Sequence, residues 1–444
     1  MTKDAGQLPQ VVIVGGGFAG LDAARALRGA PVSVTVVDRR NHHVFQPLLY
    51  QVAAAALSPG DIASPIRWIL RRQSNVRVLL AEVIAVDAPG KTVMLDDGQR
   101  LAFDYLILAP GAAHSYFGHE AWSEYAPGLK TLDDALKLRR QMLLAFEEAE
   151  RETDPSKKRH LLTFVLIGGG PTGVELAGAL AEIARHALTR EFDAIDPESA
   201  RIVLIEAGET ILPTFPPSLR DSARRALRKL GVEVWERATV TGVEQETVIV
   251  GADRLRAHTI IWAAGVAGSP LGQSFNVPLD RVGRVSVMPD LSVPGHPTVF
   301  VAGDLANFTH QTGKPLPGVA QVAKQQGKHA SRNVLRLLAG NSTTPFHYRD
   351  PGNMATVGRA EALADFGWAR FSGFIGWLLW LFVHLLFLIG FRNRLSVLLQ
   401  WAAAYFTYQR SVRLITGDTP RSRPTTDARA TDARATAPGQ AVQR

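Results

Sequence analysis

The chain contains no cysteine among its 444 residues. That absence excludes a disulfide-stapled scaffold, an iron–sulfur centre, a thiolate zinc site and catalysis by a redox-active cysteine pair. The adjacent His42 and His43 show no spacing typical of metal ligands, so we expect no metal site. Enzymes that work through cysteine chemistry are therefore set aside.

The net positive charge is small outside the C-terminal end of the chain. The net charge is +8, but nine Arg against three Asp in residues 391–444 leave only about +2 for the first 390 residues. A domain that binds a phosphate backbone carries a basic surface on its folded part. We therefore expect no nucleic-acid partner.

The N-terminal stretch MTKDAGQLPQ has no apolar signal region, which predicts a cytoplasmic protein or one on the cytoplasmic face of a membrane. The length and a hydrophobic content of 46% predict a globular protein of two or three domains.

A glycine-rich turn lies near the N-terminus. The apolar run Gln10 to Val14 predicts a buried strand, Gly15, Gly17 and Gly20 form G-x-G-x-x-G, and a helix is expected over Leu21 to Leu27. Such a turn brings backbone close to a pyrophosphate at a helix N-terminus. The next predicted strand ends at Asp38, where a carboxylate can accept hydrogen bonds from the hydroxyl groups of a ribose.

The same pattern returns about 150 residues later, in Phe164 to Gly178. Gly168, Gly170 and Gly173 repeat the turn, and the following predicted strand ends at Glu206. A carboxylate there favours a free ribose 2′-hydroxyl and repels a 2′-phosphate, so we prefer NADH to NADPH. Two dinucleotide sites in one chain indicate electron transfer between two cofactors.

Further strands end in small-residue turns at Gly111 and Gly265, and a continuous strand region is expected over Val76 to Val86. TVFVAGDLA places Asp304 at a strand end, where it suits the ribityl and phosphate region of a flavin or an N-cap. Gln321 and Gln325, four residues apart, share a helix face on which amides could reach a flavin or quinone carbonyl; a solvated surface is the alternative.

The C-terminal region is apolar and then polar. Phe374 to Phe391 is 18 residues with one ionisable side chain, His384, and would span about 27 Å as a helix, which leaves a crossing or a shallow dip open. The segment Leu395 to Arg410 is amphipathic, with polar Asn393, Ser396, Gln400, Thr407 and Arg410 opposite Leu398, Trp401 and Tyr405. It predicts a helix lying among lipid headgroups, or alternatively a buried core helix. The repeat TDARATDARA predicts a disordered tail.

Together these segments resemble the two-dinucleotide-binding-domain flavoproteins, and among them the type II NADH:quinone oxidoreductases. The resemblance covers Gln10 to Arg410 and rests on FQPLLYQVA, GGGPTGVELAG, VAGDLA and AQVAKQQG in order, followed by the apolar segment. It implies an α/β fold with two Rossmann-like domains and a C-terminal helical membrane-anchoring region. The expected units are an FAD-binding domain in two parts (10–115 and 283–345), an inserted NADH-binding domain (160–282), a membrane-associated region (346–413) and a tail (414–444).

The resemblance also implies a set of site residues. Glu175 matches a family glutamate proposed to handle protons near nicotinamide and quinone. The expected NADH contacts are Gly168, Gly170, Gly173, Glu206 and Gly265, and the expected quinone contacts are Gln321 and Gln325. The expected FAD contacts are Gly15, Gly16, Gly17, Phe18, Ala19, Gly20, Asp38, Arg39, Val83, Gly111, Asp304, Ala320 and Gln321.

The implied activity is electron transfer from NADH through FAD to a membrane quinone without proton pumping, with lipid contact through the C-terminal region and with a homodimer left open. A sulfide:quinone oxidoreductase has the same fold but works through cysteines, which are absent. Two alternatives stay open: a soluble NAD(P)H-dependent reductase of another electron carrier, and a FAD- and NADH-binding redox-sensing interaction protein.

Overall fold

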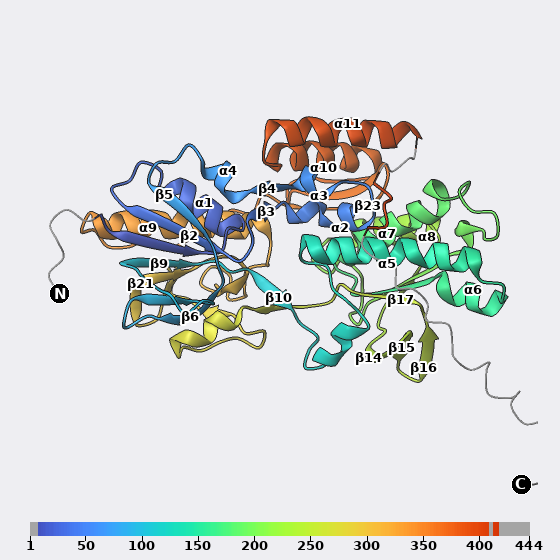
Figure 1. Ribbon diagram of the computed structural model, residues 1–444, viewed down its shortest axis with the longest axis horizontal. Coiled ribbons are helices and arrows are strands. Elements are labelled where there is room, and N and C mark those ends of the chain that lie inside the picture. The colour runs from blue at the N-terminus through green and yellow to red at the C-terminus, as the bar shows by residue number, and fades with distance from the viewer. Residues whose placement is uncertain (1–7, 408–411, 417–444) are drawn as a thin grey trace, which may run out of the picture.

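Two sheets, one of parallel strands and one parallel except for its edge strand β20, form the body of the molecule, each with helices packed on it (Figure 1). The computed structural model describes residues 8–407 and 412–416. The first sheet has the order β20-β21-β9-β1-β2-β5 and the second β13-β12-β11-β17. The strands of the first are β1 (Gln10–Val14), β2 (Ser33–Asp38), β5 (Val76–Leu80), β9 (Tyr105–Leu108), β20 (Ser292–Val293) and β21 (His296–Val301). Those of the second are β11 (Thr163–Ile167), β12 (Arg201–Ile205), β13 (Val232–Trp235) and β17 (Thr259–Trp262).

The central strand of each sheet is apolar and buried because helices cover it. On the first sheet, α1 (Phe18–Ala26) packs closely against α9 (Ala320–Leu338), where Gly327 admits the backbone of Ala19. On the second lie α5 (Leu132–Arg151), α7 (Pro171–Glu182) and α8 (Pro217–Lys229). The two apolar-strand, glycine-turn, helix patterns of the sequence thus occupy equivalent places in the two sheets.

Small elements connect these units. A two-stranded link of β10 (Ala112–His114) with β18 (Val266–Gly268) joins the loops that follow β9 and β17. The other helices between the sheets and around their rims are α2 (Leu49–Ala53), α3 (Pro59–Ile62), α4 (Ile66–Leu70) and α6 (Pro155–Leu161). The remaining strands are β3 (His42–Val44), β4 (Ala63–Pro65), β6 (Val83–Asp87), β7 (Thr92–Leu95), β8 (Arg100–Ala102), β14 (Val240–Glu244), β15 (Thr247–Val250), β16 (Asp253–Arg256), β19 (Val285–Ser286) and β22 (Ala306–Asn307).

The expected strand region over Val76 to Val86 is wrong in one respect. The chain leaves the first sheet after Leu80 and starts β6 at Val83, which pairs with β7 in a separate three-stranded sheet. The backbone amide of Ala81 donates to the carbonyl of Asp38, so the chain bends where β2 also ends. Only Ala81 and Glu82 separate the two strands, and one charged residue in an otherwise apolar run is compatible with a continuous strand, so the hydrophobic pattern did not predict the bend.

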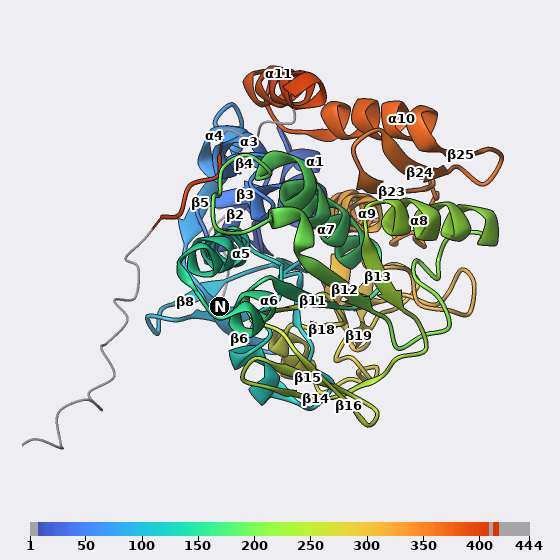
Figure 2. The ribbon, with the colours of Figure 1, turned by 90° about the vertical axis from the view of Figure 1, so that its right-hand side faces the viewer.

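The C-terminal region forms a layer of its own beside both sheets (Figure 2). It begins with an antiparallel sheet of β23 (Asn353–Gly358), β24 (Glu361–Asp365) and β25 (Arg370–Ser372), on which α10 (Gly373–Phe387) packs. The predicted 18-residue apolar run is not one helix, because α10 ends after 15 residues and α11 (Phe391–Thr407) begins beyond Gly390. Among the described residues, no helix combines the length and the apolarity that a membrane crossing requires.

The polar side of α11 faces the protein. Ser396 and Gln400 donate hydrogen bonds to the carboxylate of Asp61 at 2.9 and 3.0 Å. Trp401 packs against Trp380 of α10, and Leu399 on the outer side is 61% exposed. The inner face of α11 therefore combines these polar side chains with buried Val397 and Trp401, and leucine side chains lie on its outer face.

The start of the predicted tail is ordered against the second unit. Arg139 of α5 donates to the carbonyl oxygen of Val412, and Arg140 donates to that of Thr416, at 3.2 and 3.3 Å. Residues 414–416 therefore belong to the folded protein, contrary to expectation. The rest of the predicted tail, and Arg410 of the amphipathic segment, lie outside the described residues.

Candidate functional site

The two glycine turns have the same construction. Gly15 and Gly168 have φ angles of +98° and +116°, a conformation that residues other than glycine rarely adopt. A Cβ on Gly15 would overlap the carbonyl group of Ala109, and one on Gly168 would overlap the backbone of Ala263. In both turns the third glycine lies against the carbonyl oxygen of the first, Gly20 against that of Gly15 and Gly173 against that of Gly168. Glycine is thus required for each strand, turn and helix to meet.

A carboxylate fixes each turn from the neighbouring strand. Asp38 accepts hydrogen bonds from the backbone amides of Gly16 and Arg40 at 2.6 and 2.7 Å. Glu206 likewise accepts from the amides of Gly169 and Gly208, both at 2.6 Å. Since a carboxylate can accept about four hydrogen bonds, each keeps lone pairs for a ribose. The structure therefore brings both predicted acidic residues to their turns.

Three helix N-termini around these turns have no side-chain cap. Gly17, Gly170 and Val319 are the N-caps of α1, α7 and α9, and none of them supplies a side-chain hydrogen bond. A Cβ on Gly17 or Gly170 would meet nothing within 4 Å. The amides of the first turns, which include Phe18, Ala19, Ala320 and Gln321, thus remain for an anion or carbonyl group.

Small side chains line the floor of the first site. Ala19, Ala109, Ala302 and Ala323 form one buried cluster from α1, the ends of β9 and β21, and α9. Beside it, the amide of Gly303 donates to Oε1 of Gln326 at 2.7 Å. Such a floor allows an extended dinucleotide to approach the backbone closely, so the residues present fit FAD.

Lys130 reaches the rim of this site. Its Nζ lies 3.8 Å from Oδ2 of Asp304, which sits in the turn that follows β21. Burial lowers the pKa of Lys130, and the Asp304 carboxylate opposes that change. Sequence reasoning missed Lys130, since no local pattern places it near Asp304.

The other predicted nucleotide contacts lie on the margins. Arg39 pairs with Glu82 at 3.3 Å, next to buried Val83, and these residues adjoin the end of β2 at Asp38. Gly111 has a positive φ and open space at its Cβ position, whereas the Cβ position of Gly265 is filled by the ring of Phe117. Their role in nucleotide binding stays a prediction.

Glu175 lies on α7, two residues beyond Gly173, where three parts of the chain meet. It is 9% exposed, and its Oε1 accepts a hydrogen bond from the backbone amide of Thr356 on β23 at 3.3 Å. Burial raises the pKa of this carboxyl to about 8, and the hydrogen bond from Thr356 only partly opposes it. The carboxyl is therefore mostly protonated at neutral pH.

Hydrogen bonds continue from Thr356 toward the C-terminal helices. The hydroxyl groups of Thr356 and Tyr50 lie 2.8 Å apart, and the amide of Gln51 donates to Tyr50 at 3.0 Å. The indole of Trp401 donates in turn to Gln51 at 2.8 Å. This series of hydrogen bonds joins α7, α2, β23 and α11, and it links residues up to 350 positions apart in the sequence.

A cavity of about 110 Å³ adjoins Glu175. Its polar lining includes Glu175, Glu182, Arg359, Tyr50 and Thr356. The helices α10 and α11 contribute Ala404 and four aromatic side chains, namely Trp377, Trp380, Trp401 and Tyr405. The buried carboxyl thus faces a space that is bounded by the C-terminal helices and large enough for several water molecules.

The two predicted quinone contacts differ. Gln321 lies in the first turn of α9 and is partly buried. Gln325 donates to the carbonyl of Arg349 at 2.8 Å and accepts from the amide of Arg349 at 3.0 Å. Because an amide nitrogen has two hydrogens and its oxygen two lone pairs, each end of Gln325 can still make a further hydrogen bond, and its contact with quinone stays a prediction.

An aromatic path leads from the first glycine turn to α10. The ring of Phe18 contacts that of Phe45 at 6.0 Å between centroids, and Phe45 contacts His384 at 6.1 Å. His384 stacks on Trp380 at 4.2 Å, and its Nδ1–H donates to the Trp380 carbonyl at 2.7 Å. Burial lowers the pKa of His384 to about 4, so the ring is neutral. His384 was visible in the sequence as the one ionisable group of its run.

The adjacent histidines support the first turn. His43 is 3% exposed, its Nδ1 lies 3.2 Å from the carbonyl oxygen of Gly16, and its ring contacts Phe18 at 4.9 Å. His42 is bound locally to the side chain of Asn41. The contacts assign His43 a supporting role in shaping the turn.

Two equivalent nucleotide turns on the two sheets define a flavoprotein with two dinucleotide-binding domains. Residues 9–327 match the family of pyridine nucleotide-disulphide oxidoreductases, and residues 351–410 match the NDH2 C-terminal domain. The fold is similar to that of NDH2 from Plasmodium falciparum in complex with NADH, with a TM-score of 0.84 at 20% identity over 93% of this chain and 100% of that one.

Sequence relatives give the particular family. The chain is 44% identical over 422 residues to the type II NADH:quinone oxidoreductase Ndh of Mycobacterium tuberculosis, covering 92% of this chain and 90% of that protein. It is 30% identical over 447 residues to the internal alternative NAD(P)H-ubiquinone oxidoreductase A1, mitochondrial, of Arabidopsis thaliana, covering 93% and 87%. The chain belongs to the type II NADH:quinone oxidoreductases.

Family membership confirms the expected fold class, the cofactors FAD and NADH, and an NADH dehydrogenase that does not pump protons. Enzymes of this family use a quinone as substrate and associate with the membrane.

Proposed function

We propose that Glu175 exchanges protons during NADH:quinone turnover and that quinone arrives between α9 and α10 from a membrane bound to the outer face of α10 and α11. When bound, FAD accepts a hydride from NADH and passes two electrons to the quinone. The balanced reaction, NADH + H⁺ + quinone → NAD⁺ + quinol, takes up one proton from the surroundings. Residues of the chain must therefore bring that proton to a site closed to bulk water.

The buried carboxyl of Glu175, with its pKa raised to about 8, is the observation that carries this proposal. A group of that pKa is protonated at neutral pH yet can release its proton when a neighbouring acceptor gains charge. Tyr50 and Thr356 line the same cavity as Glu175, and their hydroxyl groups can pass protons without ionising.

Reprotonation would use the cavity. Glu175, Ala179 and Glu182 lie four and three residues apart on one face of α7, and all three line it. Water in the cavity can connect Glu175 with Glu182 at its other end. The cavity is thus a short polar path with a titratable carboxyl group, Glu175 or Glu182, at each end.

On the nucleotide side, we assign NADH to the turn at Gly168, Gly170 and Gly173, with Glu206 selecting it over NADPH. The carboxylate of Glu206 is held at the turn by two short hydrogen bonds, where a 2′-phosphate would be repelled. The first turn, with Asp38, Asp304 and the first residues of α9, is assigned to FAD. The domain boundaries expected from the sequence stay predictions.

On the quinone side, α9 and α10 meet near the first site. Nζ of Lys324 lies 4.5 Å from the ring of Phe387, and Phe45 and His384 face one another nearby. Gln321, on the same helix as Lys324, is the amide that we assign to a quinone carbonyl. An apolar and aromatic lining suits a quinone ring.

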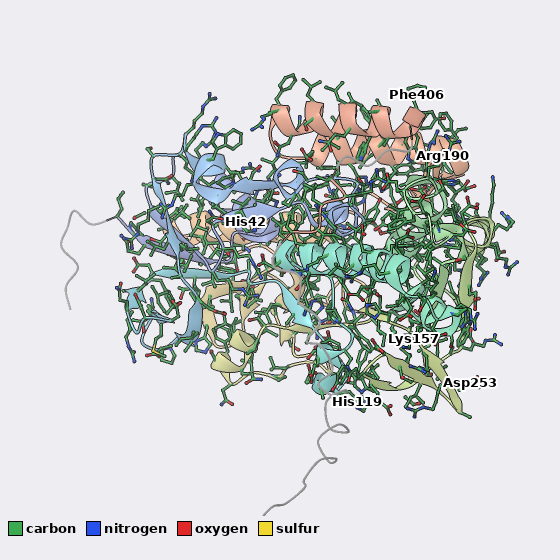
Figure 3. The ribbon with its side chains drawn as sticks, turned by 45° about the vertical axis from the view of Figure 1, so that its right-hand side comes forward. His42, His119, Lys157, Arg190, Asp253 and Phe406 are labelled. Carbon is green, nitrogen blue, oxygen red and sulfur yellow. The ribbon has the colours of Figure 1, made fainter. Side chains whose placement is uncertain are left out.

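The outer face of α10 and α11 supports lipid contact. Its exposed apolar side chains are Phe374, Ile375, Leu378, Phe382, Leu386, Phe391, Leu395, Leu398, Leu399 and Phe406. Figure 3 labels Phe406 at this edge of the molecule. A contiguous apolar surface of this size marks an interaction site, which disfavours the soluble reductase alternative. The cytoplasmic membrane face and a homodimer remain predictions, which membrane topology assays and sedimentation of the detergent-bound protein would check.

Steady-state NADH:quinone assays on Glu175→Gln test the proposal. Loss of a general acid–base group lowers turnover by about 10² to 10⁴-fold, and Glu175→Asp should retain part of the activity. Unchanged turnover of Glu175→Gln across pH would remove Glu175 from the mechanism. Rapid NADH-dependent quinone reduction by the wild type would also argue against the redox-sensing alternative.

A further inference from the structure

Four side chains from separate elements converge on the rim of the second sheet, at the end where β17 begins. His160 comes from α6, Glu246 from the turn between β14 and β15, His258 directly precedes β17, and Glu148 comes from α5. The glycine turn that we assign to NADH lies at the opposite, carboxyl end of these parallel strands. The cluster is therefore separate from the redox site.

The carboxylate of Glu246 lies between the two imidazole rings. Its Oε2 is 2.9 Å from Nε2 of His160, and its Oε1 is 3.2 Å from Nδ1 of His258. One ligand atom from each of these three residues can be chosen so that all lie within 4.8 Å of one another. The backbone amide of His258 also donates to the carbonyl of His160 at 3.3 Å, which holds the two histidines side by side.

These separations are close to those of a zinc site. Zinc is bound by His nitrogen and carboxylate oxygen at about 2.0–2.2 Å in tetrahedral geometry, so its ligand atoms stand about 3.3 Å apart. Two histidines and one glutamate are a ligand set that zinc accepts, with a water molecule in the fourth position. Small side-chain rotations would bring the three ligand atoms to these distances.

Glu148 adds an independent observation. Its Oε2 lies 3.6 Å from Nε2 of His258, on the ring edge opposite the nitrogen that faces Glu246. A histidine that binds a metal through one nitrogen commonly donates the N–H of its other nitrogen to a carboxylate, which fixes the ring and raises its basicity. Glu148 is placed for this role.

Solvent reaches the cluster. The side chains of His160 and His258 are 15% and 20% exposed, and those of Glu246 and Glu148 are 41% and 38% exposed. An ion can therefore enter, a water molecule can complete the coordination, and the two carboxylates balance the charge of a dication. Figure 3 labels Lys157 on α6, the helix that carries His160, and Asp253 on β16, the strand that pairs with β15.

We propose that His160, Glu246 and His258 form a binding site for a divalent transition-metal ion of the zinc type, with Glu148 orienting His258. The bound ion would tie α5 and α6 to the β14–β15 hairpin and to the start of β17. Its effect would be to stabilise the nucleotide-binding unit, with no part in the redox reaction. The competing explanation is a hydrogen-bonded clamp in which Glu246 only bridges the two histidines.

Metal titration of the FAD-loaded protein, freed of any polyhistidine tag and treated with chelator, distinguishes the two. We expect one Zn²⁺ per chain by calorimetry with a dissociation constant in the micromolar range or below, and a melting temperature raised by a few degrees. Co²⁺ should give the strong visible absorption of a tetrahedral site. His258→Gln and Glu246→Gln should abolish both signals, while NADH oxidation stays unchanged.

The matched control is His119→Gln, which removes an exposed imidazole elsewhere on the protein and should bind Zn²⁺ as the wild type does. The proposal is overturned if wild type and His258→Gln bind Zn²⁺ alike, or if Co²⁺ shows only the weak spectrum of an octahedral surface complex. Should a variant fail to fold, the stoichiometry and Co²⁺ spectrum of the wild type still decide.

Discussion

The backbone amide of Thr356 donates a hydrogen bond to the buried carboxyl of Glu175 at 3.3 Å. Thr356 lies on β23 of the C-terminal sheet, and Glu175 lies on the helix that follows the second glycine turn, 181 positions earlier. The contact couples the part of the chain that carries the outer apolar face to the helix of the nucleotide site. It also leaves a carboxyl in a place where its ionised form is poorly solvated.

The first prediction concerns stability against pH. Because the pKa of Glu175 is raised from 4.5 to about 8 in the folded protein, its contribution to stability is present below about pH 4.5 and is lost as pH rises through 8. Glu175→Gln cannot ionise, so it does not show this loss of stability at high pH. Its melting temperature should match the wild type near pH 5 and exceed it by a few degrees at pH 9, reflecting up to a few kcal/mol.

Thermal denaturation of the FAD-loaded proteins at the two pH values measures this difference. Glu124→Gln makes the same chemical change at an exposed position and should show a difference that does not vary with pH. A melting temperature of Glu175→Gln that stays below the wild type at pH 9 would contradict a buried, unpaired carboxylate.

The second prediction concerns the hydroxyl pair next to Glu175. Tyr50→Phe removes a hydroxyl that lies 2.8 Å from Oγ1 of Thr356 and accepts from Gln51. Leaving buried partners unsatisfied should cost about 1–3 kcal/mol of stability. Turnover should also fall, but less than in Glu175→Gln, because water in the cavity can replace one hydroxyl.

A double-mutant cycle with Thr356→Val measures the coupling of the two hydroxyl groups. We expect about 0.5–3 kcal/mol between them, as for residues of one hydrogen-bond network. Strictly additive losses in chemical denaturation would show that the two hydroxyl groups do not interact.

The third prediction concerns the choice of nucleotide. Glu206→Gln replaces an oxygen that accepts from the amide of Gly169 with a group that can donate, and it removes the charge that repels a 2′-phosphate. Charged hydrogen bonds contribute about 1.5–3 kcal/mol. The value of kcat/KM for NADH should therefore fall about 10- to 100-fold, while the ratio of NADPH to NADH use rises.

Initial rates with both nucleotides measure this selectivity. Glu209→Gln, three residues further and exposed, serves as the control and should change neither rate. An unchanged NADPH to NADH ratio in Glu206→Gln would mean that another group sets the preference.

Local patterns in the sequence predicted the nucleotide sites well. A buried strand, a glycine turn, a helix and an acidic strand end all lie within about 40 residues of one another, and steric requirements at Gly15 and Gly168 fix them. Asp38 and Glu206 therefore lie at their turns as predicted. The chemistry of such motifs is contained in short segments.

Long-range contacts could not be predicted in the same way. The sequence shows the polar side of α11 but not its partner, because Ser396 binds Asp61, 335 positions away. Gln325 is bound by the backbone of Arg349, and the candidate metal cluster joins His160 to Glu246 across 86 positions. In each case a polar side chain has a partner that only the tertiary fold brings close.

The orientation of α11 determines how the protein would meet a membrane. With Ser396 and Gln400 bound to Asp61, the outer side of α11 beyond the exposed Arg392 and Arg394 is apolar, and it continues the apolar side of α10. Aromatic Trp377 and Tyr405 stack on each other between the two helices, so the pair presents one stiff surface. Docking should therefore depend on side chains such as Phe382 and Leu399.

The fourth prediction tests this outer face. Phe382 and Leu399 are 60% and 61% exposed, and burying each in lipid contributes about 1.5–3 kcal/mol. Phe382→Asp and Leu399→Asp should each lower binding to phospholipid vesicles about 10- to 100-fold in co-sedimentation. Turnover with a short, water-soluble quinone should persist, while turnover with a long-chain quinone in the vesicle falls.

The control is Ile84→Asp. Ile84 is 52% exposed and lies on β6, which is far from α10 in Figures 1 and 2. Equal vesicle binding by all three variants would show that another surface holds the membrane.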